Sequence, residues 1–460
     1  MRLIPMPVAL AIAAMPSCIY ASDLLDAYNH ARSNDPTVSR FNSLKRSASE
    51  GIALARAPLL PSISAKISLS EQVSHGSVMA QGWQASDGRS RETSNQRTTD
   101  VTRKRSASIT ASQSILSLAK SADLRAARLS SYAQNAAYEA ALQQLAGRVA
   151  TTYFRVLMND DALSFAKENE RVVAQQLERA EQRSYVGLSA VSDIQNARAR
   201  RSTATASVID AEKELSDSRE ALTQITGQPT EALKKLRAQL PLDLPSLSGL
   251  ESWVSQAAEE SPIVLALKYK VESAEQRISS ARARHLPTID AAVGYRKTGI
   301  WPRNDNAVAA ANGRGDNGRG TITVGLVLKI PIFGRNTALS GVRQAIHQRD
   351  AAQDELESTR RQVAREIQNR YRSVIGGISK IESTKSAAES SDGALDATQA
   401  GLEIGTRTLA DVLAAELNLS VALGNYSRAR HQFILDKLLL KQAAGTVELN
   451  DLKAINSLLQ

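Results

Sequence analysis

The most constraining feature of this 460-residue chain is that it contains one unit twice. Pro36 and Pro61 in the first half recur as Pro262 and Pro287, and both pairs are 226 residues apart. Farther along, a phrase that runs from Gly to Asp recurs at an offset of 218 residues. The change of offset indicates a longer loop in the first copy. A duplicated chain of this size predicts two halves built from the same order of elements.

Each copy is predicted to run through a helix, a strand, a loop, a second strand, a long helix, a break and a closing helix. We place a signal peptide at 1–21, the first copy at 22–248, the second copy at 249–445 and a C-terminal tail at 446–460. The expected elements are strands at 62–71 and 105–115 with helices at 118–186 and 190–226, then strands at 288–297 and 320–332 with helices at 335–400 and 408–444.

The first residues are typical of an export signal. Arg2 precedes the apolar run "LIPMPVALAIAAMP", which is too short to span a bilayer and indicates a signal peptide instead of an anchor. We expect cleavage after Ala21. The single cysteine, Cys18, leaves lipidation as an alternative, although Met15–Ser17 is a poor lipobox. A mature chain without disulfides depends on packing or assembly for its stability.

Four segments alternate apolar and polar residues over about 8–11 positions, the pattern of a strand with one apolar face. A tilted membrane strand needs a similar length, roughly 9–11 residues. A half-buried hairpin in an ordinary sandwich is the alternative that the strands alone leave open. The apolar positions are Ile63, Ala65, Ile67 and Leu69; Ala107, Ile109 and Ala111; Ile289, Ala291, Val293 and Tyr295; and Ile322, Val324, Leu326, Leu328 and Ile330.

The segments between strands and breaks favour unusually long helices. Residues 118–186 contain no Pro and one Gly, and 335–400 is nearly as clean. At about 1.5 Å per residue, roughly 65 residues form a rod of about 100 Å. Such rods persist only by packing along a seam, and frequent Ala allows helices to approach closely. Aromatic residues make up 4% of the chain, which fits long helices better than a compact core.

Four amphipathic strands cannot lie alone in hydrocarbon, because open edges leave backbone groups unpaired. Single-chain membrane barrels begin at about eight strands. A membrane barrel built from this sequence must therefore be shared by two or more chains. The predicted fold class is mainly α with membrane β strands.

Features that resemble binding or catalytic motifs have simpler interpretations. The net charge of +10 is assigned to solvated helix faces, because an export signal argues against nucleic acid. The phrase "GRGDNGRG" at 313–320 contains G-x-G-x-x-G, but a strand follows it where a dinucleotide site needs a helix, so we interpret it as a turn. The polar segment 71–104 is expected to be an exposed loop. No His lies at metal spacing with another His or Cys, so we expect no metal. Because the sequence also shows no Gly-x-Ser-x-Gly elbow, no P-loop and no convincing acid/base pair, we expect no cofactor and no enzyme.

The break phrase "GTRTLADVLAAE" begins at Gly405, and its counterpart "GLSAVSDIQNAR" begins at Gly187. Gly405 can adopt the positive φ that ends a helix, and Thr408 can start the next one with Asp411 three residues later. The simplest interpretation is that Asp411 is a cap partner and that Asp193 favours a helix N-terminus. The functional alternative is a ring of Asp side chains that selects cations, which needs several copies around one axis.

These residues resemble the TolC-type outer-membrane efflux and secretion proteins. The resemblance rests on the tandem halves, the proline-bounded strands "APLLPSI" and "ARHLPTI", and the phrases "YVGLSAVSDIQNARA" and "IGTRTLADVLAAELNL". It implies a homotrimer in the outer membrane whose three chains form a twelve-stranded β-barrel. A long α-helical barrel continues across the periplasm, and the two breaks lie at its tip. The segment 227–248 and the tail after Gly445 resemble the mixed belt around the tunnel's middle.

The same resemblance implies a periplasmic gate. Arg407 matches a residue that bonds across to groups at the positions of Asp193 and Ser192, and a Tyr that helps this lock falls on Leu402. Asp411 matches the first of two acidic rings at the constriction. The second ring falls on Ala414, with Glu416 nearby, so gating and ion selectivity are expected to be organised differently here.

The implied activity is passive export across the outer membrane, with energy from an inner-membrane pump and contact through a periplasmic adaptor. The pump can be an ABC or a proton-driven protein. The "GTRT" phrase favours type I protein secretion over small-molecule efflux, and a periplasmic coiled-coil scaffold or adaptor is the alternative from another class. The prolines Pro61 and Pro287 are expected to bound the strands that contact outer-membrane lipid.

Overall fold

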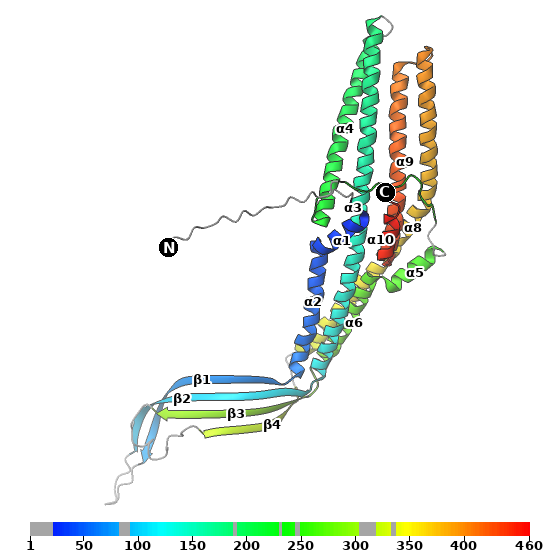
Figure 1. Ribbon diagram of the computed structural model, residues 1–460. Coiled ribbons are helices and arrows are strands. Elements are labelled where there is room, and N and C mark those ends of the chain that lie inside the picture. The colour runs from blue at the N-terminus through cyan, green and yellow to red at the C-terminus, as the bar shows by residue number, and fades with distance from the viewer. Residues whose placement is uncertain are drawn as a thin grey trace, which may run out of the picture. The chain divides into compact units, whose positions relative to one another are not determined.

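The structure, a computed structural model (Figure 1), is mainly helical with one antiparallel sheet. It describes residues 22–81, 93–186, 191–229, 232–243, 249–302, 319–332 and 337–460. The predicted signal peptide with Cys18, the first break at Gly187 and most of the 313–320 turn lie outside these residues. The chain divides into two compact units: unit 1 comprises Met1–Lys45, Gln134–Leu267 and Glu355–Gln460, and unit 2 comprises Arg46–Ala133 and Lys268–Asp354.

Each copy places short helices before its strands and two long helices after them. The helices are α1 Leu24–Asn34, α2 Pro36–Arg56, the short 3₁₀ helix η1 Ala57–Leu59, α3 Leu118–Tyr185, α4 Val191–Thr226, α5 Leu250–Glu260, α6 Pro262–Ala283, α8 Thr337–Glu403, α9 Leu409–Ala444 and α10 Leu449–Asn456. The strands are β1 Ser62–Gln81, β2 Thr93–Leu116, β3 Thr288–Pro302 and β4 Arg319–Lys329.

The two longest helices, α3 with 68 residues and α8 with 67, run through both units. Neither contains a proline, and both are rich in good helix formers such as Ala, Leu, Glu, Gln and Arg. Among the described residues, no helix combines the length and the apolar content that a membrane crossing requires. The helix expected at 335–400 spans Thr337–Glu403 and so ends three residues later than expected.

Unit 2 carries the sheet, whose order is β1-β2-β3-β4 with every neighbouring pair antiparallel. The register places the apolar residues of all four strands opposite one another, because Ile109 pairs with Tyr295 and Tyr295 pairs with Ile322. This apolar sheet face is open: Ile67 is 86% exposed and Leu326 is 74% exposed. The opposite face is more polar, with Lys66, Ser108, Arg296 and Thr321 in one cross-strand row. An apolar surface of this extent marks an interaction surface in a soluble or membrane protein.

The expected exposed loop at 71–104 is wrong, because its two ends extend the first hairpin. The ladder continues from Glu71 opposite Arg103 to Gln81 opposite Thr93. Apolar alternation had ended by that point, but an antiparallel ladder needs only backbone groups. An ion pair of 3.0 Å between Arg103 and Glu71 adds a cross-strand contact.

The other strand ends also differ from the expected ones. β3 continues beyond residue 297 to Pro302, and β4 ends at Lys329 instead of residue 332. Pro331 explains the earlier end, since proline has no N–H for the ladder. Pro61 and Pro287 directly precede β1 and β3.

Unit 1 holds the main hydrophobic core, where α1, α3, α8, α9 and α10 meet. Tyr153, Phe154 and Phe433 are among its largest fully buried side chains. Residues 232–237 pair with Ser22 and with the C-terminal residues Leu458–Gln460. Ser22 N–H donates to Ala232 O (2.9 Å), and the Lys235 and Gln460 backbones exchange bonds of 3.0 and 2.8 Å. The region after residue 227 therefore has mixed short pairings, with α10 in the tail.

Candidate functional site

The break at Gly405 is a tight turn that reverses the chain between α8 and α9. Gly405 has φ +80°, a left-handed conformation that favours glycine. The Thr406 and Arg407 N–H groups both donate to Gly401 O, at 2.8 and 3.1 Å. A Cβ on Gly401 would lie 2.6 Å from Arg407 Cγ. Two glycines thus let the loop fold back closely on the end of α8 and fix where the Arg407 backbone lies.

Asp411 completes a capping box with Thr408 at the start of α9. Its Oδ2 accepts from the Thr408 N–H (2.9 Å) and hydroxyl (2.9 Å), and its own N–H donates to Thr408 Oγ1 (3.2 Å). These bonds, the backbone one first, hold the pKa of Asp411 below its usual value. The cap interpretation of Asp411 is therefore right. The carboxylate stays ionised, and Oδ1 takes part in none of these bonds.

Figure 1 shows α3 with α4 as one antiparallel pair and α8 with α9 as another. A cavity of about 430 Å³ lies between these pairs near their turns. Three of the predicted gate residues, Asp193, Leu402 and Arg407, line it together. Arginines outnumber acidic groups among its walls, whose other members include Gln176, Arg179, Arg183, Gln399, Glu403, Thr408 and Val412. Ser192 and Asp411 are not among the lining residues.

A small apolar cluster holds the two helix pairs together behind this cavity. Val173, Leu177, Ala197 and Leu413 are buried there. Leu413 follows the capping box by two residues, so the start of α9 is anchored by burial as well as by the cap. The turn is consequently a defined element whose position depends on few contacts.

The position expected for the second acidic ring is Ala414, and the nearby Glu416 is buried. Glu416 is 8% exposed and accepts a hydrogen bond of 3.2 Å from Gln399 Nε2 on α8. Burial raises the pKa of Glu416; Gln399 and the charge of Arg171 oppose the rise, and the charge of Glu168 adds to it. Glu416 follows Ala414 by two residues, and in this single chain its carboxylate is buried against α8.

Glu416→Gln is expected to stabilise the α8–α9 pair at neutral pH by on the order of 1 kcal/mol, an ordinary single-site effect. A carboxyl with a raised pKa favours the fold when protonated. The wild-type fold is therefore most stable below the unfolded pKa near 4.5 and loses stability as the pH rises to the raised folded pKa. A glutamine at position 416 still offers an oxygen to Gln399 Nε2, and it has no charge to bury, so the loss of stability at higher pH disappears.

Native-state hydrogen exchange of α9 between pH 4.5 and 8 measures this effect. Glu382→Gln, on the exposed surface of α8, is the matched control and leaves the profile unchanged. A Glu416→Gln profile that follows the wild type would show that the buried carboxyl does not limit the stability of the pair.

A second polar cluster in unit 1 was not identified from the sequence. His431, 4% exposed, places Nε2 3.0 Å from Asp161 Oδ2, and the Ser427 hydroxyl donates to the same oxygen. Burial alone would raise the pKa of Asp161, but the bonds from His431 and Ser427 outweigh it and lower the pKa. The cluster links α3 to α9 across 270 residues. No group of three or more potential metal ligands is found within the described ranges.

Comparison with protein families gives one match that covers most of the chain. Residues 27–228 and 253–446 match the family described as outer membrane efflux protein. The two matched segments correspond to the two copies of the repeat.

Individual relatives agree with this match. The outer membrane protein TolC of Vibrio cholerae is 30% identical over 462 residues, covering 99% of this chain and 98% of the relative. The alkaline protease secretion protein AprF of Pseudomonas aeruginosa is 23% identical over 315 residues, covering 68% and 64%. Among solved structures, the Campylobacter jejuni CmeC outer membrane channel superposes with a TM-score of 0.75 at 16% identity, covering 100% of this chain and 98% of that one.

Proposed function

The chain belongs to the outer membrane efflux protein family, whose members are outer-membrane channels, and we propose that this channel exports proteins by type I secretion. The observation that carries the membrane-channel part of this proposal is the continuous apolar face across β1–β4, attached to helices of 68 and 67 residues. The face fits a membrane wall and the helices fit a tunnel of about 100 Å. The family match and the channel structures favour this function over a periplasmic scaffold or adaptor.

The proposed assembly is a homotrimer. β1 and β4 are the edges of a four-stranded sheet, and open edges in hydrocarbon leave N–H and C=O groups without partners. Three copies joined edge to edge close a twelve-stranded barrel, above the roughly eight strands at which membrane barrels begin. The long helices of the three chains then form the α-helical barrel below it.

Export needs partners, because no nucleotide-binding motif is present in the sequence. In the proposed complex an inner-membrane ABC pump supplies the energy and a periplasmic adaptor contacts the tunnel at the α3–α4 and α8–α9 turns. The tip opens when helix pairs move apart. The capping box lets the turn move with α9 as a unit, and the apolar cluster that joins the two helix pairs near the tip contains only four buried side chains.

The proposed gate uses the residues gathered around the tip cavity. Arg407 holds neighbouring helices by bonding toward Asp193 and Ser192, with Leu402 packed beside it. Asp411 of each chain faces the axis and forms one acidic ring, while Ala414 leaves the second ring absent. The support is that Arg407, Asp193 and Leu402 line one cavity and that Asp411 is ionised.

Protein cargo is favoured by the relative named for alkaline protease secretion, and small-molecule efflux by the family description itself. Deleting the gene in its native cell and complementing it from a plasmid distinguishes the two. We expect one or more proteins to disappear from the culture medium and to return on complementation. An unchanged set of secreted proteins with increased sensitivity to small toxic compounds would replace secretion with efflux.

Ile67→Lys is expected to impair barrel formation strongly. Ile67 is 86% exposed on the apolar sheet face, where a lysine at bilayer depth costs roughly 2–4 kcal/mol. The matched control is Ser64→Lys on the polar face of the same strand. Heat-modifiable trimers extracted from outer-membrane fractions provide the measurement. Equal trimer yields from the two variants would contradict the assignment of this face to lipid.

A further inference from the structure

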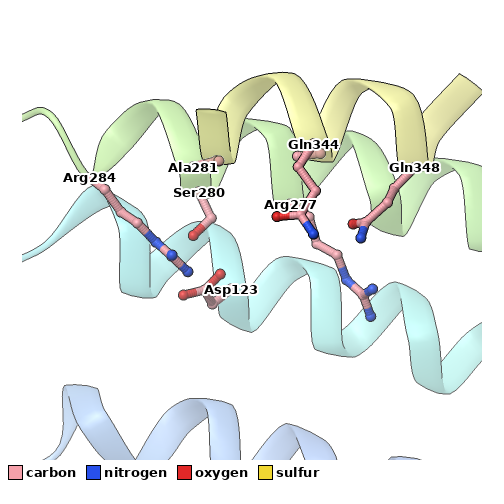
Figure 2. A pocket seen from close by; sticks show the side chains of 9 residues that line it. Asp123, Arg277, Ser280, Ala281, Arg284, Gln344 and Gln348 are labelled. Carbon is pink, nitrogen blue, oxygen red and sulfur yellow. The ribbon is translucent and has the colours of Figure 1, made fainter. Parts of the chain in front are cut away.

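Unit 2 contains a second cavity, of about 360 Å³, that the export mechanism does not use (Figure 2). Its walls come from three helices and the turn after one of them: Asp123 on α3; Arg277, Ser280 and Ala281 on α6; Arg284 just after α6; and Gly341, Gln344, Ala345 and Gln348 on α8. Figure 2 shows the Ser280 side chain of α6, and the Arg284 side chain just after that helix, extending toward the helix that carries Asp123. The cavity therefore gathers two guanidinium groups, one carboxylate, two amides and a hydroxyl.

Small residues create the hollow. Gly341 and Ala345 are one turn apart on α8, and a Cβ placed on Gly341 meets no atom within 4 Å. Arg277 lies on α6, whereas Arg284 directly follows the last residue of that helix, Ala283. A Cβ at position 341 would enter open space, so packing does not require glycine at this position.

One buried polar group in this cavity lacks a hydrogen-bond partner among the described residues. Ser280 is 1% exposed, and its hydroxyl has no hydrogen-bond partner in the structure. Within the described ranges, no salt bridge joins the side chains of Asp123, Arg277 or Arg284. A buried hydroxyl without a partner costs free energy, and native proteins normally satisfy such groups with protein, water or a ligand. The cavity is thus prepared for a polar occupant.

The cavity lies beside the junction between helices and strands. Arg284 precedes the first residue of β3 by four positions, and Asp123 follows the last residue of β2 by seven. The apolar face begins at once on the other side of the junction, where Ile289 pairs with Leu328. Since the headgroup layer is about 5–8 Å thick on each side of a bilayer, Arg284 and Asp123 lie at the depth of lipid headgroups when the strands span the membrane.

From this position and this set of charges, we propose that the cavity binds the headgroup of an ethanolamine glycerophospholipid from the membrane leaflet that faces the periplasm. The inference rests on the proposed membrane-spanning barrel. The phosphate diester is held by Arg277 and Arg284, which match phosphate geometry, and the primary ammonium is held by Asp123. Gln344, Gln348 and the Ser280 hydroxyl supply neutral hydrogen bonds.

The same charges discriminate against other headgroups. An anionic headgroup without an amine leaves the Asp123 carboxylate facing negative charge. A quaternary ammonium cannot donate a hydrogen bond to Asp123, and proteins usually bind such a group in a cage of aromatic side chains. None of the residues that line this cavity is aromatic. Phosphatidylethanolamine is therefore expected to bind more tightly than phosphatidylglycerol and phosphatidylcholine.

The test uses the purified full-length trimer in mixed micelles with each of the three phospholipids, and native mass spectrometry counts the lipids retained. Wild type should retain phosphatidylethanolamine at concentrations about 10-fold lower than the other two lipids, the factor that one charge-assisted hydrogen bond supplies. Equal retention of all three lipids would overturn the proposal, and this comparison needs no variant.

Variants then assign the groups. The double variant R277Q/R284Q and the cavity-filling Gly341→Leu should each weaken phosphatidylethanolamine retention at least about 10-fold. Asp123→Asn should abolish the preference over phosphatidylglycerol. Arg282→Gln, on the exposed surface of α6 and outside the cavity, is the matched control and should behave as wild type. A preference unchanged by Asp123→Asn would overturn the assignment of the ammonium.

Two further measurements distinguish a lipid headgroup from free phosphate, and distinguish failure of the lipid site from failure of the proposed channel function. Soluble phosphoethanolamine should compete with the lipid better than inorganic phosphate; equal competition would replace the lipid site with a simple anion site. Conductance in planar bilayers is recorded on the same preparations. A conducting trimer without lipid preference overturns only this inference, whereas a preparation that forms no channel contradicts the proposed function.

Discussion

Replacing Arg407 with alanine is expected to raise the open probability of the reconstituted channel by at least about 10-fold. In the proposed trimer each Arg407 holds neighbouring helices through charge-assisted hydrogen bonds, worth about 1.5–3 kcal/mol each. Because 1.4 kcal/mol corresponds to a factor of ten, loss of this bond in three subunits shifts the closed-to-open equilibrium strongly. The expected result is larger and more frequent conductance steps in planar bilayers.

The folded-back turn makes this variant interpretable. Arg407 is exposed, and its backbone N–H donates to Gly401 O whatever its side chain, so alanine leaves the turn intact. Arg428→Ala, on the exposed surface of α9 and away from the turn, is the matched control and should conduct as wild type. Asp193→Ala should give a similar increase, and the double variant should add little to either single one. Additive effects of the two changes would show that these side chains do not form one link.

The sheet illustrates how much of the fold the sequence contains. Alternation from Ile63 to Leu69 identified one face, and the structure places that face in register with those of the other three strands. The outer end of the first hairpin could not be predicted, because its pairing near Glu71 and Arg103 uses backbone groups and leaves no apolar period. Alternation of apolar and polar residues reveals a strand only when one of its faces is apolar, so a strand that is polar on both faces gives no such pattern.

The candidate site shows a similar division. Gly405, Thr408 and Asp411 are local in sequence, and their turn and capping box follow from residue type. Glu416 could not be placed, since its burial depends on Gln399 of another helix. The same holds for His431, whose partner Asp161 lies 270 residues earlier. Predicting such long-range polar contacts requires knowledge of how the helices pack, and the residue pattern within one segment does not contain that information.

Asp411→Asn is expected to remove block of the channel by a trivalent cation such as La³⁺. The substitution keeps the shape of the side chain, and an amide oxygen can still accept from the Thr408 N–H, so α9 keeps its cap. What disappears is one negative charge per subunit. A carboxylate about 4 Å from a trivalent ion is worth roughly 3 kcal/mol even at the dielectric constant of water. Three such contacts make a loss of affinity of 100-fold or more the expected result.

The pH dependence of block gives an independent check on the same group. Hydrogen bonds from Thr408 hold the pKa of Asp411 below 3.8, so the carboxylate remains ionised as the pH falls from 7 to 5. Block should therefore be constant over that range. The matched control is Glu416→Gln, which removes a carboxyl that is 8% exposed and packed against Gln399. If Glu416→Gln removed block while Asp411→Asn retained it, the ring would have to be built from a carboxylate that the single chain buries, and the tip would have to rearrange on assembly.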